Sequence, residues 1–244
     1  MPETLIVNEI YLSLQGESSF AGLPCIFIRL TGCDLRCSWC DTAYAFTEGG
    51  KMTLDDIQTK VSELAAPYET NALEQRLPLV ELTGGEPLLQ NNTPELAHRL
   101  CGAGFTTLIE TSGAHDISNL DPRVRRIMDL KCPGSGECAR NRWENLADLR
   151  PADEIKFVIA TREDYDWMKR VIDERALAKF CPLLCSWVAP LQENQRDKSL
   201  KPMPADATPI TLAELAEAIA ADALPVRFQL QMHKYIWSPD ERGV

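Results

Sequence analysis

Short apolar segments recur along the chain, and each has the composition expected of a buried β-strand. Most are rich in β-branched or aromatic residues and are apolar on both faces, which is typical of strands covered by helices in a parallel sheet. The expected strands span residues 25–30, 78–82, 105–110, 126–130, 154–160, 183–188 and 226–232.

Helical patterns lie between several of these strands. In residues 53–66 the apolar positions are spaced three or four residues apart, so they form one buried stripe. Thr53 and Asp56 resemble a capping box at the start of that helix, and Thr93 is expected to cap a second helix over residues 93–101. The other expected helices span residues 162–179 and 211–224, and residues 192–209 are expected to form a surface loop.

The alternation of strands and helices predicts an α/β fold with a parallel sheet. Six or seven strands suit either a partial barrel or an open doubly wound sheet. The chain of 244 residues has no internal repeat and no low-complexity tract. A single domain over residues 1–244 is therefore expected.

Composition and charge limit the partners and the location. A formal net charge of −11 gives no general attraction to phosphate backbones or anionic lipids, so no nucleic-acid partner is expected. The sequence contains no run of about 18 apolar residues, so no membrane span is expected. The N-terminus lacks the basic segment of a secretory signal. We expect a cytoplasmic protein, in which nine cysteines would not form a disulfide framework.

Three of the nine cysteines lie close together directly after the first strong strand. Cys33, Cys37 and Cys40 have the spacing C-x3-C-x2-C, and one short loop with three thiolates can hold three corners of a cubane iron–sulfur cluster. A structural zinc ion would require a fourth ligand, and no further Cys or His lies nearby. The fourth iron of a cluster would remain open to a small molecule.

A glycine-rich turn follows the second strand in the sequence Thr83-Gly84-Gly85-Glu86-Pro87. Glycines allow the backbone to approach a ligand closely, and a carboxylate can balance an ammonium group. Taken alone, these residues could equally form an ordinary turn between a strand and a helix.

Together the two motifs resemble the radical SAM superfamily, whose members bind S-adenosylmethionine (SAM) at a four-iron four-sulfur cluster. Trp39 occupies the aromatic position before the last cysteine, and Glu86 matches a glutamate that holds the methionine amino group of SAM. The resemblance implies a partial parallel (β/α)6-type barrel with an N-terminal strand extension. It also implies cofactor contacts from Trp39, Cys40, Asp41, Gly85 and Glu86.

A narrower resemblance is to the 7-carboxy-7-deazaguanine synthase family, and it extends from residue 8 to residue 239. The segment over residues 8–17 is similar to the family's N-terminal sequence, which implies substrate contacts from Leu14, Gln15, Gly16 and Glu17. The same sequence pattern would also be expected of a half-buried hairpin strand. Arg29 matches an arginine that binds the substrate, although an ion pair at the surface would also place an arginine there.

The resemblance assigns further residues near the substrate. Thr42 matches a threonine that binds Mg²⁺, but from sequence alone it would be interpreted as a cap or turn residue. His233 lies in a C-terminal segment similar to the family's and would contact the substrate, as would Thr111. Pro239 aligns with a C-terminal contact, although this chain continues to Val244. The remaining implied SAM contacts are Gly113, Asp129, Leu130 and Lys131.

The family resemblance implies a reaction, cofactors and partners. A radical derived from SAM would remove a hydrogen atom from 6-carboxy-5,6,7,8-tetrahydropterin. Ring contraction and loss of ammonia would then give 7-carboxy-7-deazaguanine, in queuosine and 7-deazapurine biosynthesis. The cofactors would be the cluster, SAM and Mg²⁺. An external electron donor such as flavodoxin and a homodimeric state are also implied.

Other functions remain open from the sequence. A glycyl-radical activase would share the cluster loop but would not need Gln15, Gly16, Glu17 or His233. An iron–sulfur electron carrier would normally ligate every iron with protein groups, and a zinc module would perform no SAM chemistry. An auxiliary cluster is a further alternative to a structural role for the pairs Cys132 and Cys138, and Cys181 and Cys185.

Overall fold

The strands form one continuous mixed sheet in the computed structural model, which describes residues 2–68, 76–238 and 241–243. The strand order is β3-β1-β2-β4-β5-β6-β7-β8-β9. The strands are β1 (Thr4–Leu14), β2 (Pro24–Leu30), β3 (Gly50–Thr53), β4 (Leu79–Gly84), β5 (Thr107–Thr111), β6 (Arg125–Asp129), β7 (Glu154–Ile159), β8 (Leu183–Trp187) and β9 (Val226–Gln229).

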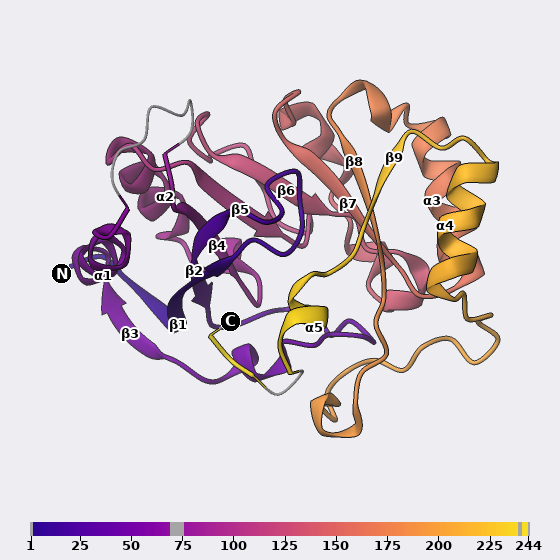
Figure 1. Cartoon of the computed structure of the whole chain (residues 1–244), viewed down its shortest axis with the longest axis horizontal. Coiled ribbons are helices and arrows are strands. Elements are labelled where there is room, and N and C mark those ends of the chain that lie inside the picture. Colours follow the sequence, from indigo (N-terminus) through magenta and orange to yellow (C-terminus); the bar gives the residue numbers. More distant parts are fainter. Residues whose placement is uncertain (1, 69–75, 239–240, 244) are drawn as a thin grey trace.

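The sheet has a parallel part and an antiparallel extension. From β2 through β9 each neighbouring pair is parallel, while β1 pairs antiparallel with both β2 and β3 at one edge. The sheet is open and curved (Figure 1). This architecture confirms the predicted α/β partial barrel with an N-terminal extension, and all seven predicted strands are present within about two residues at most boundaries.

Helices cover the outside of the sheet. They are α1 (Leu54–Ala65), α2 (Thr93–Gly102), α3 (Arg162–Glu174) and α4 (Leu212–Ala221), whereas the short α5 (His233–Ile236) lies at the cavity described below. In Figure 1, α1 and α2 lie beside the N-terminal half of the sheet, and α3 and α4 lie beside β7–β9. The predicted capping box of α1 is confirmed, because Thr53 and Asp56 bond reciprocally. No helix of the described residues is long and apolar enough to cross a membrane.

Two local predictions were wrong. Asn92, not Thr93, is the cap residue of α2, because the Thr93 hydroxyl donates to the carbonyl of Pro87 instead. The helix predicted over 162–179 ends at Glu174, because Ala176 adopts a left-handed φ of 49° before a 3₁₀ turn. No α-helix was predicted in the connections from β5 to β6 and from β6 to β7, and these connections, both fully described, contain turns, bends and 3₁₀ turns.

The apolar core has two layers, one on each face of the sheet. The larger layer lies under the helices. A smaller layer fills the bottom of the barrel interior and consists of Cys25, Phe27, Leu79, Leu108, Ile127 and Leu184. All nine cysteines are free thiols in this structure.

The hairpin loop between β1 and β2 closes the open side of the barrel. The side-chain amide of Gln229 on β9 accepts from the backbone N–H of Ser18 at 3.1 Å and donates to its carbonyl at 2.8 Å. The backbone N–H of Ser19 donates to Glu154 on β7 at 2.9 Å. These bonds bring the N-terminal extension next to the last strands, so residues 15–19 border the barrel interior.

Candidate active site

A cavity of about 250 Å³ lies where the parallel strands end. In barrels of parallel strands, the carboxyl end is where loops gather catalytic groups. Its walls include most of the residues singled out from the sequence, namely Leu14, Gln15, Gly16, Glu17, Arg29, Cys33, Cys37, Trp39, Cys40, Asp41, Thr42, Gly85, Thr111, Asp129, Lys131 and His233.

The inward face of the strands changes from apolar to polar toward this cavity. Side chains alternate between the two faces of a strand, so every second residue points into the barrel. Five of the six apolar residues of the lower layer are followed, two positions later, by a polar residue, while Cys25 is followed by Phe27 of the same layer. These pairs are Phe27 and Arg29, Leu79 and Glu81, Leu108 and Glu110, Ile127 and Asp129, and Leu184 and Ser186.

The loop that carries the three cysteines is held from below by the turn after β6. The backbone N–H and the hydroxyl of Ser38 donate to the carbonyls of Ser135 and Gly134 at 3.0 and 2.7 Å. The backbone N–H of Arg36 donates to the Glu137 carboxylate at 2.7 Å. With Leu35 buried, these contacts fix the loop against the sheet.

The glycine-rich turn packs directly on the start of the same loop. A side chain on Gly85 would place its Cβ 2.1 Å from the carbonyl oxygen of Gly32 and 3.0 Å from Cβ of Cys33. The backbone N–H of Glu86 donates to Gly32 at 2.8 Å. Gly84 has a φ of 130°, which only glycine adopts readily. The two sequence motifs therefore form one structural unit.

The three thiols fit an iron–sulfur cluster with three protein ligands. All three line the same cavity. Burial raises the pKa of Cys33 to about 11 and of Cys40 to about 12, so thiolates here need a cationic partner. In the described residues, no group of three or more His, Cys, Asp or Glu is gathered closely enough for a single metal ion. Three thiols from one loop suit three corners of a cluster, whereas a structural zinc ion would require a fourth ligand.

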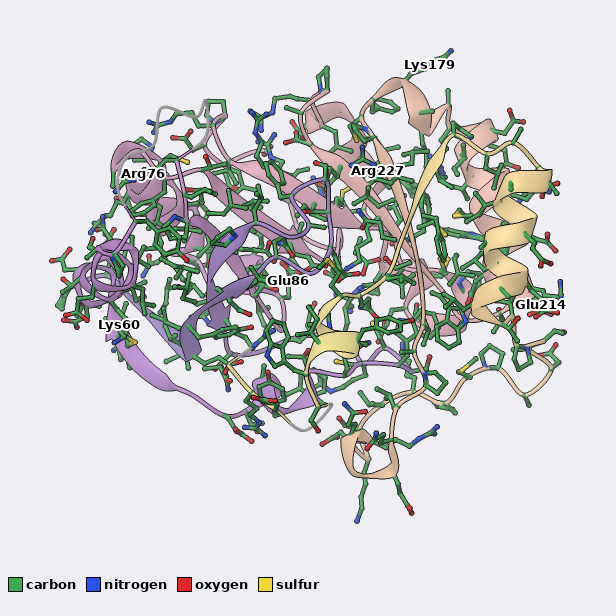
Figure 2. All side chains as sticks on the ribbon, in the orientation of Figure 1. Lys60, Arg76, Glu86, Lys179, Glu214 and Arg227 are labelled. Carbon is green, nitrogen blue, oxygen red and sulfur yellow. The ribbon has the colours of Figure 1, made fainter. Side chains whose placement is uncertain are left out.

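Glu86 does not reach the cavity through its side chain, in contrast to the implied SAM contact. Its carboxylate is fully buried and accepts hydrogen bonds from Leu88 N, Thr111 Oγ1 and Ser112 N at 2.9, 2.9 and 2.7 Å. Figure 2 shows Glu86 inside the molecule, whereas Lys60 and Glu214 lie at its periphery. In this structure Glu86 holds Thr111 and Ser112, which do line the cavity.

Of the residues predicted to contact SAM after β5 and at the end of β6, some line the cavity and others are buried elsewhere. Asp129 and Lys131 line the cavity and pair at 2.6 Å, and the second carboxylate oxygen of Asp129 is buried without a hydrogen-bond partner in the described chain. Leu130 and Gly113 are not part of the wall. Leu130 is buried in the outer core, and the Gly113 carbonyl accepts from Arg142 N at 3.0 Å.

The C-terminal segment packs against the end of the N-terminal extension. The backbone N–H of Met232 donates to the Gly16 carbonyl at 3.1 Å, and a Cβ on Gly16 would lie 2.8 Å from Nδ1 of His233. Gly16 thus makes room for the imidazole. Burial lowers the pKa of His233, which favours its neutral form. Pro239 lies outside the described residues.

Arg29 forms an ion pair, but the pair is enclosed in the site and not on the surface. Its Nε lies 2.7 Å from Glu9 Oε1, and the two side chains are 15% and 18% exposed. Its Nη2 donates to the hydroxyl of Tyr11 at 2.7 Å, and the hydroxyl of Tyr44 donates to the same Glu9 oxygen at 3.0 Å. The guanidinium is therefore held in one orientation at the cavity wall.

Asp41 and Thr42 follow the last cysteine and face the C-terminal segment. The Thr42 hydroxyl donates to Asp41 Oδ1 at 2.9 Å, and Lys234 Nζ lies 2.6 Å from Asp41 Oδ2. Thr42 precedes a 3₁₀ turn but makes no side-chain cap. Although burial acts in the opposite sense, Lys234 lowers the pKa of Asp41 and keeps it ionised. The threonine oxygen therefore keeps lone pairs available at the cavity.

Besides Lys234 of α5, three charged residues of the wall were missed from the sequence. These are Glu81, Glu110 and Lys156, which lie inside buried strands, Glu81 and Glu110 as single charges and Lys156 two residues after Glu154. The side-chain amide of Gln15 donates to Glu81. Burial and the charge of Glu110 raise the pKa of Glu81. A charged residue at an inward position of a buried strand is the sequence signal that could have identified them.

Comparisons with known proteins agree with this geometry. The radical SAM superfamily profile matches residues 27–133. Proteins named 7-carboxy-7-deazaguanine synthase from Koribacter versatilis and Chlorobaculum tepidum are each 41% identical to the chain. The matches cover 98% of this chain and 99% and 97% of theirs. The crystal structure of QueE from Escherichia coli has the same fold, with a TM-score of 0.66, 22% identity, and coverage of 94% of this chain and 95% of that chain. The chain therefore belongs to the 7-carboxy-7-deazaguanine synthase family of the radical SAM superfamily.

Proposed function

We propose that this protein converts 6-carboxy-5,6,7,8-tetrahydropterin to 7-carboxy-7-deazaguanine, with ring contraction and loss of ammonia. One observation carries the proposal. The cysteine loop, the glycine-rich turn, the Gln15–Glu17 segment and His233 come from distant parts of the sequence and border one cavity. Full-length relatives at 41% identity have the name of this activity.

As a radical SAM enzyme, the chain uses a four-iron four-sulfur cluster and SAM. The cluster, held by Cys33, Cys37 and Cys40, would supply the electron that cleaves SAM and so begins hydrogen-atom abstraction. Trp39, Asp41, Gly85 and Lys131 line the adjoining wall and would contact SAM there. The apolar layer below the cavity would exclude water from the reacting atoms.

The substrate contacts are assigned by charge and position. Arg29 would bind the pterin carboxylate, because an oriented guanidinium matches a carboxylate with two parallel hydrogen bonds. His233, Thr111 and the Leu14–Glu17 segment would contact the ring. The net charge of the chain does not attract an anionic substrate, so these local groups must supply the attraction.

Thr42 would contribute one ligand to Mg²⁺. A hydroxyl is a weak ligand, so substrate oxygens and waters would have to complete the coordination. The position of Thr42 at the same cavity wall as Arg29 supports this role.

We also propose a single-domain, cytoplasmic, homodimeric enzyme that has no nucleic-acid partner and receives electrons from an external donor such as flavodoxin. The single domain is supported by the one continuous sheet. The cytoplasmic location is supported by nine free thiols, which persist in a reducing compartment.

The test is anaerobic reconstitution with iron and sulfide, followed by incubation with the tetrahydropterin, SAM, reductant and Mg²⁺. We expect 7-carboxy-7-deazaguanine and ammonia in equal amounts, and no product from Cys37→Ala. Absence of product from enzyme that carries a full cluster and cleaves SAM would refute the proposal. A glycyl radical formed on a partner protein would instead identify an activase, which the full-length relatives do not favour.

A further inference from the structure

A nearly buried lysine lies in the cavity wall between two carboxylates. Lys156 lies on β7, and its side chain is 5% exposed. Its Nζ is 2.8 Å from Glu17 Oε2 and 2.5 Å from Glu110 Oε1. Glu17 belongs to the loop after β1 and Glu110 to β5, so one ammonium group joins three separate parts of the chain at the cavity.

The remaining oxygens of the two carboxylates differ in their environment. The hydroxyl of Ser186 on β8 donates to Glu17 Oε1 at 3.2 Å, so both oxygens of Glu17 are oriented. Glu110 Oε2 has no hydrogen-bond partner among the described residues, and the side chain is 29% exposed in the cavity wall. The arrangement therefore presents two carboxylates, fixed relative to one another, with acceptor capacity left for a ligand.

A buried ion pair of this kind is a poor way to stabilise a fold. Removing charges from water has a large desolvation cost, and apolar residues of similar volume often stabilise a protein as well or better. The neighbouring layer of the barrel interior is apolar on β2, β4, β5, β6 and β8, with Glu154 as the charged residue of β7 at that level, so most of the strands do not require charges. The charges are better explained by what they present to the cavity.

We propose that Lys156 is a positioning residue that fixes Glu17 and Glu110 as a pair of acceptors for the 2-amino-4-oxo edge of the pterin. The inference rests on the proposed function. That edge has two neighbouring donors, the ring N3–H and the 2-amino group, and carboxylates accept such donors well. Along the sheet, Arg29 on β2 lies two strands from Glu110 and four strands from Lys156, so the pterin carboxylate and the donor edge would bind at different parts of the cavity wall.

The charge balance around Lys156 predicts how pH affects a variant. Glu110 and Glu17 raise the pKa of Lys156 against the effect of burial, and Asp129 on β6 acts in the same sense. Lys156 in turn lowers the pKa of Glu17, although burial alone would raise it. Without the ammonium, the pKa of Glu17 should therefore rise.

Four other titratable groups complete this environment. Lys131, His233 and Lys234 also face the network, and Glu81 lies beside Glu110. None of them replaces the ammonium between Glu17 and Glu110. In a Lys156 variant, kcat/KM should consequently fall as pH decreases, over a range in which the wild type is unaffected.

The experiment compares reconstituted wild type, Lys156→Met, Lys156→Met/Glu110→Gln and the control Lys169→Met, whose lysine pairs with Asp222 on the molecular surface. Each is assayed with the tetrahydropterin and with its 2-oxo analogue, which replaces a donor by an acceptor. We expect Lys156→Met to lower kcat/KM for the pterin by about a hundredfold, mainly through KM. Preference for the 2-amino substrate should shrink by about tenfold or more.

The double variant separates positioning from folding. Removing the excess charge of Glu110 should restore the melting temperature and cluster content, but it should not restore discrimination between the two substrates. Wild-type discrimination and an unshifted pH profile in the folded double variant would overturn the proposal. Failure of the wild type to convert the pterin would instead count against the proposed function, so the two failures are distinguishable.

Discussion

Single charged residues determine what the cavity can bind. On β2, β4 and β5 the barrel interior is apolar up to one layer, and then Arg29, Glu81 and Glu110 follow at the next inward positions, while Lys156 follows Glu154 on β7. Each charge is paired or hydrogen-bonded to a group from a different element. Burial makes an unpaired charge costly, so these pairings fix side-chain orientation as well as protonation.

Replacement of Arg29 by alanine tests the carboxylate contact. The KM for the tetrahydropterin should rise by about tenfold or more, because a hydrogen bond to a charged group contributes about 1.5–3 kcal/mol. The cluster absorbance and SAM cleavage without substrate should remain. Arg227, an exposed arginine of β9 (Figure 2), provides the matched alanine control. A lower melting temperature and cluster content with unchanged KM would show a purely structural role.

Thr42 and Mg²⁺ can be tested by metal titration. Mg²⁺ requires about six oxygen ligands at about 2.1 Å, and one hydroxyl cannot hold it, so metal affinity should increase when the pterin is present. Thr42→Ala should reduce turnover and weaken the response to added Mg²⁺, while Thr42→Ser should keep part of both. Equal rates with and without Mg²⁺, after removal of divalent ions from enzyme with an assembled cluster, would exclude this role.

Among the elements, the loops depend on each other more than on the strands that precede them. The glycine-rich turn after β4 packs on the cysteine loop after β2, and the turn after β6 supports that loop from below. The hairpin loop of β1 and β2 bonds to β9 and to β7. A change in one loop should therefore be measurable in the ligands held by another.

Gly85→Ala is the sharpest test of this dependence. The added Cβ would collide with backbone atoms of Gly32, at 2.1 Å from its oxygen and 2.6 Å from its carbonyl carbon. The cysteine loop should shift, so the iron content per chain after reconstitution should fall clearly below that of the wild type.

Gly102→Ala is the control for this substitution. A Cβ at Gly102, the last residue of α2, meets nothing within 4 Å. Alanine is favoured over glycine in helices by roughly 0.5–1 kcal/mol, so this variant should have unchanged iron content and equal or higher stability. Full iron content in Gly85→Ala would contradict the close packing of the two loops.

For the whole molecule, sequence patterns predicted the features that depend on residues close together in the sequence. Apolar strands and the periodic stripe of α1 were predictable, because they reflect one buried face. The conformations of the connections around β6 were not, because long-range bonds stabilise them, such as Gly134 N to Asp164 and Asn145 to the His115 carbonyl. The Lys156 network was missed for the same reason, since its partners lie 46 and 139 residues away.

Because groups from both ends of the chain line the cavity, ligand binding should stabilise the fold as a unit. A ligand at about 100 times its Kd stabilises the native state by about 2.7 kcal/mol, and each kcal/mol raises Tm by about 2–4 °C for a domain of this size. Reconstituted enzyme should therefore melt several degrees higher with SAM and the pterin than with SAM alone. Arg29→Ala should lose about half or more of the increment that depends on the pterin while keeping the increment from SAM, because only the carboxylate contact is removed. An equal pterin increment in wild type and Arg29→Ala would mean that the substrate carboxylate binds elsewhere in the cavity.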